Sequence, residues 1–455
     1  MLEPSLPRPD YCLSYWHKTT RGFQYLSANA ASELPAGSKC VVIGSGISGA
    51  LTAFSLIEEG VSGEEIVILE AREAVSGASG RNAGHVRPDA FRGYQAYAKV
   101  HGSDQALKII ANEKLVFEKV GEFVRRHEVP CDFNPTTTFD VCLTEEFAQY
   151  EADSMRAYVD AGGDVSHVKF YEGDEAAART RVPQAVAAYE WPAGSSHPAK
   201  LGQWLLNSSI ESGVQLFTHT PVTGVSKENN MWKVETTRGA ILAEIVIHCT
   251  NAYAAALLPQ LHGFVTPNKA QAHSVVPSPS FSGKGALSST MSLRHSMHHF
   301  YSLIQRKGDG AFILGVSRHN PHLSDSTKRE MISFDDSAYN HEIADDAISQ
   351  FGKMFPQLVE SKRRHGEGLD HAWTGIIGMT PDSVPLIGPI PELPGQYICA
   401  GFNGHGMARV FTCAPGLVKL VCGKSWEDTG LPECFQYSAE RLRRAQEKGQ
   451  KGTVW

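Results

Sequence analysis

A glycine-rich turn between an apolar run and a helical pattern constrains the fold more than any other feature of the chain. Residues 39–43 (KCVVI) suit a buried parallel strand, and they lead directly into GSGISG at residues 44–49. Residues 50–59 (ALTAFSLIEE) follow with apolar side chains at helical spacing, and residues 65–69 (EIVIL) form a second apolar run. This order predicts a βαβ unit and therefore an α/β fold.

Three glycines and one acidic residue make this unit a predicted dinucleotide site. Gly44 permits the tight turn, Gly46 allows the backbone to approach a pyrophosphate, and Gly49 allows the helix to pack closely on the strand. The helix N-terminus offers unpaired N–H groups to phosphate. Glu70 ends the second strand about 20 residues later, where an acid accepts both ribose hydroxyls and disfavours NADP. The alternative is a tight turn in an α/β fold that binds no ligand.

Two further glycine-rich segments favour FAD over NAD. Residues 77–85 (GASGRNAGH) follow the second strand closely and suit a loop pressed against a large flat cofactor, although a surface loop is the alternative. Arg81 can meet phosphate charge there, and Asn82 can donate to polar ring atoms. Residues 401–407 (GFNGHGM) follow the strand YICAG and open a helix, whose N-terminus can stabilise negative charge on a reduced flavin. Residues 373–388 fit a loop and strand beside the cofactor.

The rest of the chain carries clear element signals. We expect helices at residues 103–128, 144–162, 198–213, 335–355 and 407–421, and Thr144 is the expected N-cap of the second. Residues 299–306 and 311–316 flank KGDG and predict a hairpin. Residues 1–38 are expected to form an arm, and residues 424–455, which carry many charges, a surface tail.

Composition narrows the functional class. A net charge of −7 argues against a general nucleic-acid binder. The 9 cysteines include no CxxC pair, which favours reduced thiols in a reducing compartment, and no apolar stretch reaches the ~20 residues of a membrane span. We therefore expect a cytoplasmic protein without a membrane or nucleic-acid partner and without a metal site. The oligomeric state stays open.

As an ordered set, these motifs resemble the D-amino-acid-oxidase-like superfamily of FAD enzymes, which includes glycine, sarcosine and γ-glutamylputrescine oxidases. The resemblance covers residues 11–425 and extends to SYW at residues 14–16 and HPAKL at residues 197–201. It implies a glutathione-reductase-like Rossmann FAD-binding domain intertwined with a substrate domain on a mixed or antiparallel sheet. The division that we expect is an arm (1–38), FAD-binding segments (39–100, 195–265, 362–425), substrate segments (101–194, 266–361) and a tail (426–455).

The resemblance also implies which residues hold FAD. Val222 would contact adenine through its backbone, and Thr250 and Asn251 sit where the family closes on the cofactor. The turn at residues 401–407 would cradle the pyrimidine edge of the ring. The full cofactor-binding set is Gly44, Gly46, Gly49, Glu70, Ala71, Ser79, Arg81, Asn82, Gly84, His85, Val222, Thr250, Asn251, Gly375, Gly401, Asn403, Gly404, His405, Gly406 and Met407.

The implied reaction is oxidation of an amine or amino acid. Hydride would pass from the carbon bearing nitrogen to flavin N5, giving an imine, and oxygen would then reoxidise the flavin to give hydrogen peroxide. We expect Tyr301 and Trp373 to cage the substrate, with Asn403 and His405 as further catalytic residues. Arg318 is a candidate for binding a substrate carboxylate.

Alternatives remain at several of these positions. Tyr301 and Trp373 fit core aromatics equally well, and Arg318 fits a surface cation. Lys269 and Lys284 are candidates for promoting oxygen reduction, although each also fits a solvated lysine. An amine dehydrogenase that uses another acceptor, a non-catalytic flavin-binding protein, a flavin monooxygenase and a tRNA-modifying protein are the competing functions.

One departure from the family concerns covalent flavin attachment. Some relatives link the ring through a cysteine just before an aromatic-Thr pair. This chain has His371 and Ala372 before Trp373 and Thr374, so no thioether is expected. A histidyl link through His85 or His371 is left open.

Overall fold

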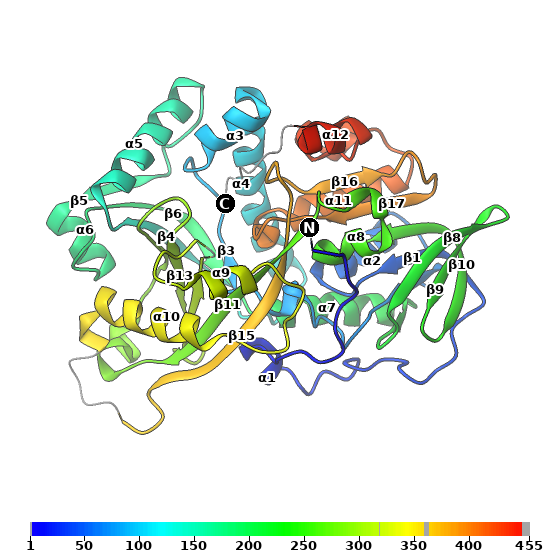
Figure 1. Ribbon diagram of the computed structural model, residues 1–455, viewed down its shortest axis with the longest axis horizontal. Coiled ribbons are helices and arrows are strands. Elements are labelled where there is room, and N and C mark those ends of the chain that lie inside the picture. The colour runs from blue at the N-terminus through cyan, green and yellow to red at the C-terminus, as the bar shows by residue number, and fades with distance from the viewer. Residues whose placement is uncertain (1, 318, 359–363, 448–455) are drawn as a thin grey trace.

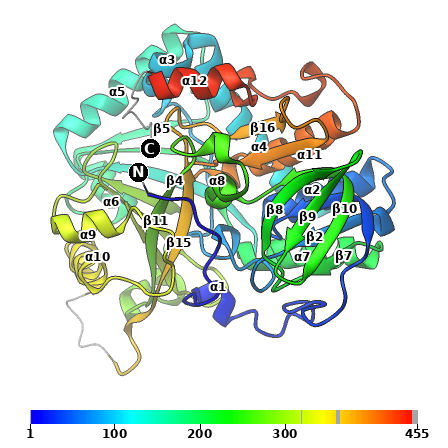
Figure 2. The ribbon, with the colours of Figure 1, turned by 45° about the vertical axis from the view of Figure 1, so that its right-hand side comes forward.

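Two β-sheets organise the chain, and the N-terminal segment crosses the molecule between them (Figures 1 and 2). The computed structural model describes residues 2–317, 319–358 and 364–447. Each sheet collects strands from distant parts of the chain, so the two halves are intertwined rather than consecutive. This arrangement confirms the predicted α/β class with two sheets.

The first sheet has eight strands and is parallel around its centre. The β8–β9 hairpin joins it through β9, which pairs antiparallel with β10, and β16 pairs antiparallel with β17. In spatial order the main strands are β16 (Leu386–Pro389), β17 (Gln396–Ala400), β10 (Gly239–His248), β1 (Gly37–Ile43), β2 (Ile66–Leu69) and β7 (Gln215–Phe217), and the hairpin is β8 (Val222–Glu228) and β9 (Met231–Thr236).

The second sheet has nine strands and is mixed, because β4 and β12 are parallel while its other pairs are antiparallel. The predicted hairpin is its β13–β14 pair. In spatial order the strands are β15 (Gly368–Met379), β11 (Thr266–Val276), β14 (Phe312–Val316), β13 (Phe300–Gln305), β12 (Thr290–Arg294), β4 (Asn134–Cys142), β6 (Ala187–Ser195) and β3 (His85–Val86), and β5 (Lys169–Glu172) pairs with β6.

Helices cover both sheets. Among the described helices, none has the length and apolar composition that crossing a bilayer requires. They are α1 (Tyr15–Lys18), α2 (Ile47–Glu58), α3 (Tyr94–His101), α4 (Ser103–Arg126), α5 (Glu145–Asp160), α6 (Gly173–Thr180), α7 (Pro198–Glu211), α8 (Ala254–Leu257), α9 (Asp325–Glu330), α10 (His341–Met354), α11 (Val410–Val421) and α12 (Ala439–Glu447).

The predicted βαβ unit is present as β1, α2 and β2, and β1 pairs parallel with β2. Gly49 shows why its position admits only glycine. A Cβ added there would lie 1.9 Å from the carbonyl oxygen of Gly44, so any side chain would push α2 away from the turn. The close helix packing predicted from the motif is therefore confirmed.

Thr144 caps α5 as expected, since its hydroxyl accepts a hydrogen bond from the backbone N–H of Phe147 at 3.2 Å. The helix expected at residues 335–355 instead begins at residue 341. Asn340 is its N-cap, accepting from the N–H of Ile343 at 3.3 Å. The preceding Asp336 is buried against Arg72, with its two carboxylate oxygens 3.0 Å from Nη1. A long-range ion pair, which helical periodicity cannot reveal, thus holds these residues outside the helix.

The segment after residue 425 also differs from the expected surface tail. Phe435 and Leu442 are buried in it, and Arg441 donates to Asp382 at 2.6 and 2.9 Å. The many charged residues in this segment predicted exposure to solvent. In the structure, however, the ion pair between Arg441 and Asp382 holds α12 beside β16. Residues 448–455 lie outside the described part of the chain.

Strand membership bears on the expected domain boundaries, which remain a prediction. β15 follows residue 362, in a segment expected to bind FAD, yet it pairs along its whole length with β11 of the second sheet. β3 likewise lies in the second sheet although it precedes residue 100. Both strands cross from one half to the other, and both carry residues of the site described next.

Candidate functional site

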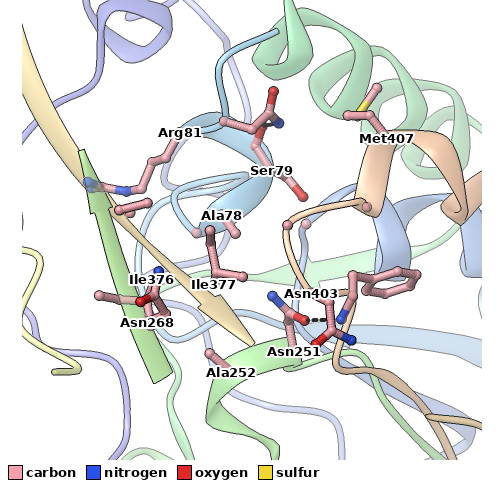
Figure 3. Close-up of a pocket in the computed structure, with 18 of the residues that line it drawn as sticks. Ala78, Ser79, Arg81, Asn251, Ala252, Asn268, Ile376, Ile377, Asn403 and Met407 are labelled. Carbon is pink, nitrogen blue, oxygen red and sulfur yellow. Dashed lines mark hydrogen bonds between the residues drawn. The ribbon is translucent and has the colours of Figure 1, made fainter. Parts of the chain in front are cut away.

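A cavity of about 440 Å³ lies where the two sheets meet. Its size is that of a typical small-molecule site. The glycine turn at residues 44–48 and the turn at residues 402–408 both line it, together with the 77–85 loop and strands β11 to β15. Figure 3 shows Ala78, Ser79, Asn251, Asn403 and Met407 converging on this space from different segments. The two glycine-lined helix starts therefore meet at one cavity, as the sequence predicted.

One end of the cavity is built from the βαβ turn. Gly46 is needed because a Cβ there would lie 2.9 Å from the hydroxyl of Ser79, and that hydroxyl accepts from the N–H of Ile47 at 2.8 Å. Glu70 is 8% exposed, and its Oε2 accepts from the N–H and the hydroxyl of Ser45 at 2.9 and 2.7 Å. The acid is thus held at the end of β2, beside Ala71 and Val222 in the cavity wall.

Asn251 fixes the second turn beside the first. Its side-chain oxygen accepts from the N–H groups of Gly401 and Phe402 at 3.1 and 3.2 Å. Figure 3 shows Asn251 beside Asn403 of the same turn. Asn251 has a φ of 46°, a left-handed conformation that asparagine tolerates better than most residues. The neighbouring Thr250 lines the cavity with a buried hydroxyl that has no partner among the described residues. Such an orphaned group suits a ligand contact.

The other end of the cavity carries positive charge that the sequence analysis did not predict. Arg87 and Arg294 line it, and both contact the buried Asp140, at 2.8 and 2.9 Å. Arg92 lies behind them and donates to the same carboxylate at 2.6 Å. Met291, Phe300 and Val316 add apolar walls. The cavity thus combines a dinucleotide-type end with a cationic end.

Comparison with known proteins identifies the family. The model of the DAO family, described as FAD dependent oxidoreductase, matches residues 39–420. The chain belongs to the DAO family of FAD-dependent oxidoreductases.

The relatives are distant in sequence. The chain is 24% identical to the oxidoreductase OrdL of Haemophilus influenzae over 81% of this chain and 79% of that protein. It is 23% identical to the Escherichia coli γ-glutamylputrescine oxidoreductase, covering 84% and 83%. Among solved structures, L-proline dehydrogenase from P. horikoshii superposes with a TM-score of 0.70 at 23% identity, covering 92% of this chain and all of that one.

The residues at the dinucleotide-type end fit FAD. Of the expected cofactor-binding set, most members line the cavity, whereas Gly49, Gly84 and Gly401 stand just behind it. Gly84 has a φ of 80°, and a Cβ there would lie 2.9 Å from the carbonyl oxygen of Ser196. Gly401 donates its N–H to Asn251. These three glycines shape the wall rather than face the ligand.

Asn403 differs from its expected catalytic role. Its amide donates to the carbonyl of Gly401 at 2.6 Å and to the hydroxyl of Thr380 at 2.9 Å, and its Oδ1 accepts from the N–H of Thr380 at 2.7 Å. The amide group is thereby used once inside the turn, at Gly401, and once outside it, at Thr380. Asn403, with a φ of 55°, is a positioning residue that fastens the turn to the end of β15.

His405 lines the cavity and faces Glu113 of α4, with Nδ1 3.4 Å from Oε1. Arg409 donates to the same carboxylate oxygen at 3.0 Å. Burial lowers the pKa of His405 below its usual value, and Glu113 only partly opposes this. Burial raises the pKa of Glu113, but the charges of His405 and Arg409 outweigh it and lower that pKa to about 2. His405 is therefore neutral near pH 7 and gains its positive charge only in acid, where that charge helps to keep Glu113 ionised.

The expected substrate cage of Tyr301 and Trp373 is wrong. Side chains alternate along β13, so Phe300 and Ser302 line the cavity while Tyr301 points into the opposite core and donates to Asp346 at 2.8 Å. Trp373 is fully buried and donates to the carbonyl of Arg81 at 2.8 Å. Both aromatics are core residues, which was the alternative in the sequence analysis.

Arg81 does not present its guanidinium to phosphate as expected. It donates to the carbonyls of Ser76, Thr374 and Cys12 at 2.7, 2.7 and 2.6 Å. Arg81 thereby joins the N-terminal arm to β15, and only part of the residue contributes to the cavity wall. Asn82 likewise spends its side chain within the loop, bonding to Ser79 and Gly84.

The remaining candidates fall into three groups. Lys269 does not line the cavity, although its neighbours in β11 do, and Lys284 is exposed on a separate turn.

His371 contacts the carbonyl of Leu13 at 2.6 Å, whereas His85 lines the cavity with both ring nitrogens unpartnered among the described residues. Burial lowers the pKa of His85 to about 3, so it is neutral. Arg318 lies outside the described residues.

Proposed function

We propose that this DAO-family enzyme oxidises an amine or amino acid that carries a carboxylate, at the carbon bearing nitrogen. When bound, FAD would supply the redox chemistry, since it would accept the hydride from the carbon bearing nitrogen to leave an imine, and oxygen would then accept two electrons and two protons to give hydrogen peroxide. The chain binds and orients the substrate. The observation that carries the proposal is the pair Arg87 and Arg294 at the end of the cavity beyond the FAD-binding turns.

The two arginines can bind an anion because Asp140 does not satisfy them. Arg87 donates from Nε to Thr138, and Arg294 donates from Nε to Asp140 and from Nη1 to the carbonyl of Met297. Nη2 of Arg87 lies 2.8 Å from the Asp140 carboxylate but makes no hydrogen bond among the described residues. The side-chain hydrogen bonds of Arg294 within the described part of the chain start from Nε and Nη1 alone. Buried guanidiniums need an anionic partner, and a carboxylate matches their planar donors.

The pocket walls support orientation of the substrate. The guanidinium of Arg294 stacks over the ring of Phe300, 4.1 Å from its centroid, which fixes the plane of the charged group. A carboxylate anchored there would direct the substrate's amine-bearing carbon back toward the FAD end. Fixed orientation of this kind is a main source of rate acceleration.

A dehydrogenase is the second candidate, because a specific comparison favours it. The structure with a TM-score of 0.70 is named L-proline dehydrogenase. Sarcosine dehydrogenase from Homo sapiens is another relative, 24% identical over 89% of this chain and 42% of that protein. Both names describe enzymes that oxidise an amino compound. The two candidates differ only in what reoxidises the flavin.

The test is a substrate panel on the purified yellow protein. We expect N-alkyl amino acids and amino acids to bleach the flavin absorbance anaerobically, and polyamines without a carboxylate to leave it unchanged. Stopped-flow mixing of the reduced enzyme with oxygen, with peroxide detection, separates oxidase from dehydrogenase. Protein without flavin absorbance, or bleaching by polyamines alone, would contradict the proposal.

An Arg87→Gln variant tests the anion site directly. Loss of one charge-assisted hydrogen bond, about 1.5–3 kcal/mol, predicts a roughly 10- to 100-fold weaker substrate Kd with the flavin spectrum unchanged. Arg156→Gln is the matched control, since Arg156 is an exposed arginine of α5 with a side chain 68% accessible. Equal effects of the two substitutions would remove Arg87 from the site.

A further inference from the structure

The arginine cluster behind the cavity contains a carboxyl group that the proposed reaction does not use. Glu151 of α5 is completely buried, and neither of its carboxyl oxygens has a hydrogen-bond partner among the described residues. An ionised carboxylate in such a place is costly, because neither water nor a donor compensates its charge. The neutral, protonated form avoids this cost.

The packing of α5 brings Glu151 against the cluster. Phe147, one turn earlier on the helix, lies beneath Arg294, whose guanidinium is 5.9 Å from the ring centroid. Ser154, one turn later, donates to the carbonyl of Arg92 at 3.0 Å. Residues four before and three after a given position share its helix face. Glu151 therefore lies on the helix face that packs against Arg92 and Arg294, two of the three arginines that hold Asp140.

The charges around Glu151 explain its protonation state. Burial raises the pKa of Glu151 well above its usual value and the charge of Asp140 raises it further, while Arg92 and Arg294 oppose both. The titratable and charged groups that face it from the packed elements are Asp89 and Arg92 of the 87–93 loop, Asp140 and Cys142 of β4, Tyr189 of β6, Arg294 of β12 and Tyr150 of α5.

The balance of formal charge depends on this one proton. Arg87, Arg92 and Arg294 supply three positive charges, and Asp89 and Asp140 supply two negative ones. With Glu151 neutral, one positive charge is left over at the cavity wall. With Glu151 ionised, the excess disappears.

We propose that protonated Glu151 keeps the arginine cluster cationic so that it can bind the substrate carboxylate, and that ionisation of Glu151 turns this binding off. The proposal rests on the carboxylate site proposed above. Glu151 touches no substrate atom and is a positioning residue. The sign follows from linkage: carboxylate affinity is highest below the pKa of Glu151 and falls above it, and a bound carboxylate raises that pKa.

The experiment titrates benzoate, whose ring suits the apolar walls, into the FAD-loaded enzyme and follows the flavin absorbance from pH 6 to 9. For the wild type we expect Kd to rise by about tenfold per pH unit above the pKa of Glu151, since the protonated form binds best. Glu151→Gln, which is always neutral, is expected to keep the low-pH affinity at every pH. Glu146→Gln, an exposed glutamate of the same helix, is the control and is expected to keep the wild-type profile.

The outcomes distinguish the role of Glu151 from the existence of the carboxylate site. A flat wild-type profile, an alkaline loss that persists in Glu151→Gln, or weak binding by that variant at every pH would overturn the role of Glu151 while leaving the carboxylate site intact. Failure of the wild type to bind benzoate at any pH would instead remove the carboxylate site itself. If Glu151→Gln does not fold, the wild-type infrared spectrum provides the test: a protonated-carboxyl band must disappear with the same midpoint as benzoate affinity, and its absence at pH 6 would overturn the proposal.

Discussion

At the scale of single residues, side chains around the cavity do more positioning than direct contact. Asn251, Asn403 and Arg81 were expected to meet the cofactor, yet each spends hydrogen bonds on the backbone of a neighbouring segment. Their residue types still matter, because Asn251 holds the turn at residues 401–402, Asn403 joins that turn to Thr380, and Arg81 joins the N-terminal arm to β15. Loss of such a residue is therefore expected to affect cofactor retention before it affects chemistry.

Asn251→Ala tests this view. The substitution leaves the N–H groups of Gly401 and Phe402 without their acceptor, and unpaired buried groups cost about 1–3 kcal/mol each. We expect a lower unfolding temperature and faster FAD release, measured by the rise in flavin fluorescence on heating. Asn251→Asp keeps an acceptor oxygen and is expected to lose less. An unchanged release temperature in the alanine variant would contradict the assignment.

The buried Glu113 gives a prediction about pH. Its folded-state pKa of about 2 lies below the usual value near 4.5, so its contribution to stability is fully present above pH 4.5 and is lost as pH falls toward 2. The difference corresponds to about 3 kcal/mol. Urea unfolding at several pH values is expected to show that the free energy of unfolding falls less steeply in acid for Glu113→Gln than for the wild type. If the free energy of unfolding falls equally steeply in acid for both proteins, Glu113 does not cause the acid destabilisation.

At the scale of elements, the N-terminal arm is part of the cofactor-binding half rather than an appendage. Leu6 and Pro7 line the cavity, and the N–H of Cys12 donates to the carbonyl of Asp336 at 2.9 Å. Tyr11 lies under the guanidiniums of Arg72 and Arg81, 4.5 and 5.1 Å from its ring centroid. Figure 2 shows the arm passing between the two sheets on its way to α1.

Shortening the arm is expected to loosen FAD without altering the residues of the cationic end. Deletion of residues 2–9 removes the Leu6 and Pro7 wall, which predicts an FAD dissociation rate raised by about tenfold, or ~1.4 kcal/mol. The measurement is the release of fluorescent FAD after dilution. Leu2→Ala, at an arm residue that is 47% exposed, is the control and is expected to retain FAD normally. Equal retention in the deletion variant would mean that the arm does not enclose the cofactor.

At the scale of the whole molecule, the contact between the two sheets contains the cavity that fits FAD and a buried ion pair. The ion pair of Arg72 and Asp336 joins the segment after β2 to the segment before α10, with side chains 3% and 1% accessible. FAD binding to the folded state alone adds stability by mass action, about 2.7 kcal/mol at 100 times Kd. The cofactor and the ion pair are therefore both expected to stabilise the contact between the two sheets.

A thermal unfolding series at increasing FAD concentration tests this coupling. We expect Tm to rise continuously with FAD in the wild type and to start several degrees lower in Asp336→Asn, because one partner of a buried ion pair is then uncompensated. Asp335→Asn is the matched control, since Asp335 is the neighbouring aspartate with a side chain 42% accessible. A Tm that is independent of FAD would contradict the expectation that bound FAD stabilises the contact between the two sheets.

The FAD-binding half could be predicted from the amino-acid sequence, because its signals are local. The turn at residues 44–49 needs its glycines within one βαβ unit, and strand, turn and helix follow from neighbouring residues. The cationic end became visible only in the folded chain, since Arg87 and Arg294 belong to segments far apart in the sequence and meet through Asp140 on β4. Only the folded chain shows that Tyr301 faces the core, because alternation along a strand reveals two faces but not which of them lines a cavity.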